Sequence, residues 1–227
     1  MYSKETVKKS AAQRREIAAV HAHSTGSNGH NREQDIMNAA IRSFSEKGYA
    51  ATSLQELADA VGLMKGSLYH YITSKESLLC RIFQEAHLQA NSIIELVESR
   101  NLEPAEKLRE FTIELAKFYV VNQERAAVYF TQARHLTGKD RQTVDQQQRD
   151  FRLYVRSLVE SAHKAGLTRR DIDVRVASYF LLAAINGIHT FLRDQDQERA
   201  HAVAIEIATL SCSAILLQGP PKKAKKI

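Results

Sequence analysis

The chain of 227 residues is 44% hydrophobic and 26% charged, and its formal net charge at pH 7 is +6. This composition supplies enough apolar residues for a folded core, and the length allows one or two domains. No apolar run reaches the ~20 residues that a membrane helix needs, and the first thirty residues lack the apolar segment of a secretory signal. We therefore expect no membrane contact and predict a cytoplasmic location.

The positive charge is concentrated at the two ends of the chain. Residues 1–30 carry a net charge of +3 and the tail 220–227 carries +4, which leaves −1 for residues 31–219. The basic character of the whole chain is thus weak support for DNA binding, although both ends are able to add phosphate contacts. Residues 1–30 are predicted to form a flexible basic arm. The two cysteines, Cys80 and Cys212, are expected to be reduced thiols of the core.

The first predicted helix covers residues 32–47, where apolar residues recur at a spacing of four and Gly48 follows as a terminator. Two shorter helical patterns come next. Ser53 is placed to cap the first of them, with Glu56 completing a capping box. Gly62 permits the sharp turn between the two. Two short helices joined by a glycine turn indicate a helix-turn-helix, whose second helix enters the major groove of DNA.

The predicted helix-turn-helix extends from about Ser53 to Ile72. A helix in the major groove must offer polar groups to bases and phosphates while its other face packs. No acid lies between Gly62 and Lys75, so this segment is locally positive. The predicted DNA-binding residues are Thr52, Ser53, Lys65, Gly66, Ser67, Tyr69, His70 and Lys75.

The runs K-G-S-L-Y-H-Y from Lys65 to Tyr71 and S-K-E-S-L-L from Ser74 to Leu79 are typical of one family, and with them this part of the chain resembles the TetR family of transcriptional regulators. The resemblance is dense over residues 31–91 and beyond them depends only on helical pattern and length. It implies an all-α homodimer, with a three-helix DNA-binding domain joined to a larger helical domain that binds a small ligand and dimerises. The residues that carry it are Phe44, Gly48, Tyr49, Thr52, Glu56-Leu57-Ala58, Val61-Gly62, K-G-S-L-Y-H-Y from Lys65 to Tyr71, and S-K-E-S-L-L from Ser74 to Leu79.

Further helices are predicted after the motif. Thr73 and Glu76 are interpreted as a capping box that opens a helix of about 25 residues at Ser74. The remaining helices are expected at 104–122, 125–136, 141–165, 173–192 and 197–217. About nine helices and no alternating strand pattern indicate an all-α fold. The predicted domains are the DNA-binding domain 31–91 and the ligand-binding and dimerisation domain 92–219, followed by the basic tail.

Small and apolar residues at three- and four-residue spacing mark the last two predicted helices as a dimer interface. The same stripes would also serve to close the core of a monomer. A symmetric pair of motifs that reads two half-sites favours the homodimer. The residues are Val176, Phe180, Ala183, Ala184, Gly187 and Ile188 in one helix, and Ala204, Ile207, Ala208, Ser211, Cys212 and Ile215 in the other.

Candidate effector-binding residues are polar groups on apolar helices and a stripe of three arginines. A solvated surface accounts for the stripe, and so does an anionic ligand such as an acyl-coenzyme A. Some TetR-like regulators of lipid or steroid catabolism look similar in K-G-S-L-Y-H-Y and in the helix of the stripe, which implies the acyl-coenzyme A. The candidates are Tyr119, Tyr129, Arg134, Arg149, Arg152, Arg156 and Asn186.

The predicted function is a ligand-responsive repressor that a small molecule releases from double-stranded operator DNA. An activator, or a regulator controlled by a partner protein, fits the same residues. A helical interaction module without specific DNA binding is the alternative from another class. Catalytic and nucleotide-binding motifs are absent from the sequence, and His21, His23 and His30 lack ligand partners at suitable spacing. No enzyme, cofactor or metal site is therefore expected.

Overall fold

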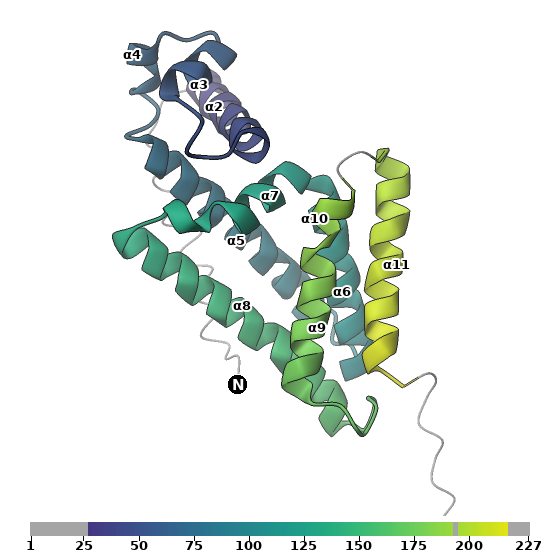
Figure 1. The fold of residues 1–227 in the computed structure, drawn as a ribbon. Helices are drawn as coiled ribbons and strands as arrows, with labels where there is room; N and C mark the ends of the chain where they lie inside the picture. The colour runs from purple at the N-terminus through teal and green to yellow at the C-terminus, as the bar shows by residue number, and fades with distance from the viewer. Residues whose placement is uncertain (1–26, 193–194, 218–227) are drawn as a thin grey trace, which may run out of the picture. The chain divides into compact units, whose positions relative to one another are not determined.

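The computed structural model describes residues 27–192 and 195–217, which are helical almost throughout (Figure 1). The all-α prediction is confirmed, since the only extended pairing within these ranges is an isolated antiparallel bridge between Thr168 and Leu216. The tail 220–227 and most of the predicted arm lie outside the described residues. The end of that arm is a correction, because the first described helix already begins at Ser27.

The described chain divides into two compact units. The N-terminal unit contains residues 27–91 together with 124–147, and the C-terminal unit contains 92–123 together with the described residues from 148 onward. Two helices, α5 (Lys75–Ser99) and α8 (Gly138–Lys164), run without a break from one unit into the other. The segment 124–147 therefore packs with the predicted DNA-binding residues, which no local sequence pattern indicates.

The N-terminal unit is built around one hydrophobic core. Its helices are α2 (Ser27–Glu46), α3 (Leu54–Ala60), α4 (Lys65–Leu68), most of α7 (Gln123–Thr131), the 3-10 helix η1 (Ala133–His135), and the parts of α5 and α8 named above. The segment 124–147 adds Val128, Leu136 and Val144 to this core. The residues of α2 to α5 at its centre are Ile36, Met37, Phe44, Leu57, Leu68, Leu79 and Phe83.

Two local predictions in this unit were wrong. The helix expected at 125–136 ends at Thr131, and after Gln132 the chain continues as η1. The capping box of α5 is formed by Ser74 and Ser77, whose side chains each accept a hydrogen bond from the other's backbone N–H at 3.0–3.1 Å. Glu76, which the sequence assigned to that box, accepts hydrogen bonds from Thr137 instead.

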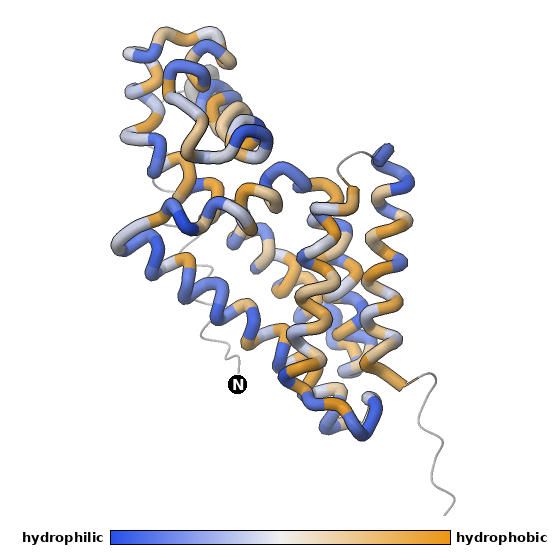
Figure 2. The backbone as a smooth tube through the Cα atoms, in the orientation of Figure 1, coloured by the Kyte–Doolittle hydropathy of each residue, from blue (hydrophilic) through white to orange (hydrophobic). Residues whose placement is uncertain are grey.

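The C-terminal unit contains α6 (Pro104–Val121), α9 (Val174–Asn186), α10 (Ile188–Phe191), α11 (Gln197–Ile215) and the remaining parts of α5 and α8. Asp173 and Asp196 cap α9 and α11 by accepting backbone N–H groups. The predicted helix 173–192 is divided at Gly187, after which α10 begins. Figure 2 shows α9 as hydrophobic along most of its length.

Both cysteines are free and buried, as expected. Burial raises the pKa of the Cys80 thiol to about 12, with a further contribution from Asp140. Burial also raises the pKa of Cys212, which lies on the side of α11 that faces the core. Both thiols are thus protonated at neutral pH and are poor nucleophiles.

Candidate nucleic-acid interface

The predicted helix-turn-helix is present, and its turns depend on two glycines. Gly48 ends α2 with φ of +88°, and Gly62 makes the turn between α3 and α4 with φ of +67°. Both angles lie in the left-handed region that side chains other than glycine rarely adopt. The predicted capping box is confirmed, because Ser53 Oγ accepts from Glu56 N at 3.1 Å and Glu56 accepts from Ser53 N at 2.8 Å. These contacts fix where α3 begins and ends.

Two of the predicted DNA-binding residues face inward. Thr52 is 1% exposed, and its hydroxyl donates to the Gly48 carbonyl at 3.0 Å. Lys75 Nζ donates to the carbonyls of Tyr49 and Thr52 at 2.8 Å each and lies 4.4 Å from the centre of the Tyr49 ring. The polar groups that the sequence assigned to phosphate thus hold the loop before α3. This is a structural role, and it differs from the predicted one.

The same loop is braced by the segment 124–147. The Gln132 side chain, which is 8% exposed, accepts a hydrogen bond from Tyr49 N at 3.1 Å, and the His135 ring lies 5.0 Å from the Tyr49 ring. On the other side of the motif, Glu76 Oε1 accepts from Thr137 N at 3.2 Å and from Thr137 Oγ1 at 2.9 Å. The helix-turn-helix is therefore fixed at both ends by residues distant in the sequence. The sequence offered no signal for these contacts.

The outer face of α4 carries the remaining candidates. Leu68 is fully buried and anchors α4 on the core, whereas Lys65, Gly66, Tyr69 and His70 are exposed. Ser67 is half-buried, and Ser53 is exposed at the start of α3. The structure thus brings Lys65, Ser67, Tyr69 and His70 onto one short helical segment.

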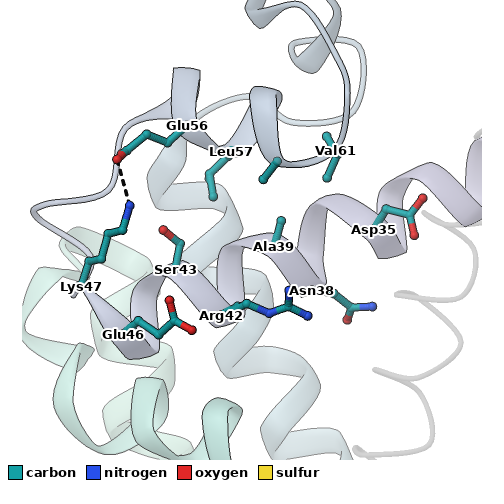
Figure 3. Close-up of a pocket in the computed structure, with 11 residues that line it drawn as sticks. Asp35, Asn38, Ala39, Arg42, Ser43, Glu46, Lys47, Glu56, Leu57 and Val61 are labelled. Atoms are coloured by element: carbon teal, nitrogen blue, oxygen red, sulfur yellow. Dashed lines mark hydrogen bonds and ion pairs between the residues drawn. The ribbon is translucent and has the colours of Figure 1, made fainter.

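A second surface feature lies between α2 and α3 and differs from the α4 face in its charge. It is a groove of about 550 Å³ whose lining includes Asp35, Arg42, Glu46, Lys47 and Glu56 (Figure 3). Lys47 and Glu56 form an ion pair of 3.1 Å across it. The Ser53 backbone N–H and Lys47 together lower the pKa of Glu56. Three acids face two bases in this lining, so the groove lacks the positive character that phosphates require.

The predicted effector residues fall into both units. Tyr129 stacks on Phe83 with ring centroids 4.8 Å apart, and Arg134 is exposed on η1, so both belong to the N-terminal unit. In the C-terminal unit, Tyr119 donates a hydrogen bond to the Asn186 side chain at 3.2 Å. Arg149, also in the C-terminal unit, is exposed on α8.

Arg152 and Arg156 are exposed on α8 near Tyr179 of α9. Arg175 donates a hydrogen bond to the Tyr179 hydroxyl at 3.2 Å. That bond lowers the pKa of Tyr179, and the charges of Arg156 and Arg152 add to the effect. The three guanidinium groups therefore produce a positive potential around one tyrosine hydroxyl.

The two predicted dimer stripes behave differently. On α9, Val176, Phe180 and Ala183 are exposed, whereas Ile188, in α10, is buried. On α11 the predicted stripe is mostly internal, because Ala204, Ala208, Ser211, Cys212 and Ile215 are buried within the C-terminal unit. The large apolar residues that α11 exposes are Ile205 and Leu210, at 36% and 63%. The apolar periodicity correctly predicted that α11 is amphipathic, but the face that the sequence analysis assigned to the dimer partner packs in the core of the same chain.

A short exposed helix without acidic residues, held on a buried core and braced at both ends of its motif, defines a DNA-binding regulator of the helix-turn-helix class. Comparison with known families agrees. Residues 36–82 match the bacterial regulatory proteins of the tetR family, and residues 101–215 match the tetracyclin repressor-like C-terminal domain. The chain belongs to the TetR family of transcriptional regulators.

Individual relatives cover most of the chain. The HTH-type transcriptional repressor KstR2 of Rhodococcus jostii (strain RHA1) is 28% identical over 151 residues, which are 66% of this chain and 74% of that protein. The structure of ketosteroid transcriptional regulator KstR2 of Mycobacterium tuberculosis is similar with a TM-score of 0.77 at 19% identity, over 82% of this chain and 96% of that chain. AibR in complex with isovaleryl coenzyme A and operator DNA has a TM-score of 0.67 at 24% identity, over 78% and 97%. At these identities the two structures establish the shared fold.

Proposed function

We propose that this protein is a cytoplasmic, homodimeric repressor that leaves its operator when a small molecule binds. The observation that carries the proposal is the exposed, acid-free face of α4 on a buried and braced helix-turn-helix. Lys65, Ser67, Tyr69 and His70 are its proposed DNA contacts, together with Gly66 and the exposed Ser53. Thr52 and Lys75 act indirectly by holding the loop before α3. The curated relative KstR2, named as a repressor, supports the direction of control.

The proposed dimer forms through α9 and α11. One motif of this size contacts few base pairs, so a symmetric pair on two half-sites supplies the affinity and length of an operator. Residues 174–191 are apolar enough to qualify as a membrane span by length and composition, and only 33% of that window is buried within one chain. Large side chains remain exposed there, with Val176 at 62% and Phe180 at 48%. A second copy of the chain would cover them, together with Ile205 and Leu210.

The proposed effector is an acyl-coenzyme A bound in the C-terminal unit. Its phosphates would meet the arginines of α8, of which Arg152 and Arg156 already lie near Arg175 and Tyr179. Guanidinium groups bind phosphate oxygens in a bidentate way, which gives both affinity and orientation. The named ligand of AibR, isovaleryl coenzyme A, supports this class of effector. The hydrogen-bonded pair of buried Tyr119 and half-buried Asn186 is a candidate contact for the acyl part.

An operator release assay tests the proposal. The full chain is bound to its upstream DNA, and coenzyme A and acyl-coenzyme A thioesters of increasing chain length are titrated at fixed salt. We expect at least one thioester to release the DNA and coenzyme A alone to be weak, since only the thioester has an acyl group to bury. Replacement of Arg149, Arg152 and Arg156 by alanine should abolish release and spare operator binding. Exposed Arg170→Ala is the matched control.

The outcomes separate the alternatives. No sequence-dependent binding would favour a helical interaction module, and binding that raises transcription in a reconstituted assay would favour an activator. Specific binding that no thioester changes would refute the effector class while leaving the DNA-binding function intact. The proposal includes no catalytic step, in agreement with relatives named as transcriptional regulators.

A further inference from the structure

Met64, which the sequence prediction passed over, has an exposure that the fold does not explain. Its side chain is 78% exposed, the highest value among the large hydrophobic residues of the described ranges. The neighbouring Leu63 is half-buried and packs on the core, and Leu68 is fully buried. Met64 therefore contributes nothing to the packing of α4.

Met64 is also the N-cap residue of α4, and it makes no side-chain hydrogen bond there. Serine, threonine, aspartate or asparagine at an N-cap stabilises a helix by about 1 kcal/mol relative to an apolar residue. The chain thus places at this position a side chain that neither caps the helix nor packs on the protein. Contact with a binding partner would account for this side chain.

The surroundings of Met64 are exposed and uncrowded. Gly66 lies in α4 without a left-handed φ, and a Cβ atom added to it would meet nothing within 4 Å. Glycine in a helix costs about 1 kcal/mol relative to alanine, and the protein's own packing gives no reason for it here. A low, uncrowded surface beside an exposed methionine is suited to the close approach of a base pair.

We infer that Met64 reads the 5-methyl group of a thymine in each half-site of the operator. The first residues of a recognition helix are the ones that reach base edges. A methionine side chain lacks the donors and strong acceptors that read the polar edges, and the thymine methyl is the apolar group of the major groove. The three rotatable bonds of the methionine side chain allow its thioether to adjust to van der Waals contact with the methyl group. The inference rests on the proposed DNA binding and adds a specificity residue to it.

Deoxyuridine substitution tests the inference, because it removes only this methyl group. Preferred operators are first selected from random double-stranded DNA with the full-length protein. Symmetric pairs of thymines are then replaced by deoxyuridine, one pair at a time, and the Kd is measured by fluorescence anisotropy at fixed salt. Burial of one methyl-sized group corresponds to about fourfold in affinity, so a pair on two half-sites should weaken wild-type binding roughly 15-fold at one position.

Two variants and a control locate the effect. With Met64→Ala, the same deoxyuridine pair should change the Kd less than about twofold, because the contact is already lost. Met64→Leu should keep most of the sensitivity. Val121→Ala, which removes an exposed apolar side chain of the C-terminal unit, should behave as wild type. Circular dichroism checks that all variants fold.

The possible results distinguish failure of the Met64 contact from failure of the proposed DNA binding. Selected half-sites without thymine, the absence of any methyl effect in the wild type, or an effect that persists in Met64→Ala would each overturn the role of Met64. Failure of the wild type to select any sequence would instead refute the proposed function.

Discussion

Lys65 and Lys75 carry the same charge within one motif, but the structure gives them opposite surroundings. Lys65 is exposed at the start of α4 and makes no hydrogen bond or ion pair that the structure records within the described residues. Lys75 places its ammonium on two backbone carbonyls and beside an aromatic ring. We therefore predict that replacing each lysine by methionine, which keeps most of the side-chain length, produces different losses.

Lys65→Met should weaken DNA binding in a salt-dependent manner. Loss of one phosphate contact lowers the slope of log K against log salt by ~0.9, and two protomers double this to ~1.8. The difference in affinity between wild type and variant should then shrink roughly tenfold between 50 and 200 mM salt. The free energy of unfolding should stay within ~0.5 kcal/mol of wild type, as is usual for an exposed side chain.

Lys75→Met should chiefly destabilise the protein. Its two hydrogen bonds join a charged donor to the carbonyls of Tyr49 and Thr52, and one such bond contributes about 1.5–3 kcal/mol. The contact with the Tyr49 ring adds about 0.5–1 kcal/mol. We expect urea unfolding to show a loss on the order of 2–4 kcal/mol, below the sum of these contributions, because contacts of one half-buried side chain are not additive. The salt slope of the remaining folded protein should be unchanged.

Anisotropy titrations at four salt concentrations and urea unfolding of both variants form the assay. A reduced salt slope for Lys75→Met at unchanged stability would refute the reasoning, since it would place the ammonium on phosphate as the sequence suggested. Unchanged slope and affinity for Lys65→Met would remove Lys65 from the interface.

Three further predictions concern other parts of the fold. Thr52→Val should lower the free energy of unfolding by about 1–2 kcal/mol, whereas Thr52→Ser, which keeps the hydroxyl that donates to the backbone, should lose less; equal losses in urea unfolding would contradict this. Because the folded state lowers the pKa of Glu56, the ionised carboxylate stabilises the fold above its ordinary pKa of 4.5, and this stabilisation is lost as the pH falls through the folded pKa. The difference in Tm between wild type and Glu56→Gln should therefore be present at pH 7 and vanish in acid. A difference in Tm that is constant with pH would argue against it. Leu210→Glu should weaken dimerisation on the order of 100-fold in sedimentation experiments, because a charge would enter an apolar interface. The control Leu153→Glu, at an exposed position on α8, should leave dimerisation unchanged. Intact dimers of Leu210→Glu would exclude this face as the interface.

Local chemistry made the helix-turn-helix predictable from sequence. Gly48 and Gly62 indicate left-handed turns because other residues rarely adopt that conformation, and Ser53 with Glu56 forms its capping box within four residues. The burial of Leu68 follows from the apolar pattern of the second short helix. Each of these depends on neighbours in the chain, which is the information that a sequence pattern contains.

Long-range competition explains where the prediction was wrong. Glu76 had a local use as a cap, but Thr137 offers it two hydrogen bonds, and the local box formed from serines instead. Lys75 had a plausible use on phosphate, but its ammonium donates to two carbonyls of the preceding loop. On α11 the small residues pack inside the unit. Periodicity reports that a helix has an apolar face without reporting what covers it.

The two braces of the helix-turn-helix restrict how an effector is able to act. Gln132 holds Tyr49 before α3, and Thr137 holds Glu76 after α4, so one short segment fixes both ends of the motif. This segment leads directly into α8, which continues unbroken into the C-terminal unit. A ligand changes operator affinity only by its difference in affinity for two states of the protein. An effector that shifts α8 would therefore act on Thr137, the residue that precedes this helix, whereas α5 and the α6–α7 junction at residues 123–124 are the other chain connections between the two units.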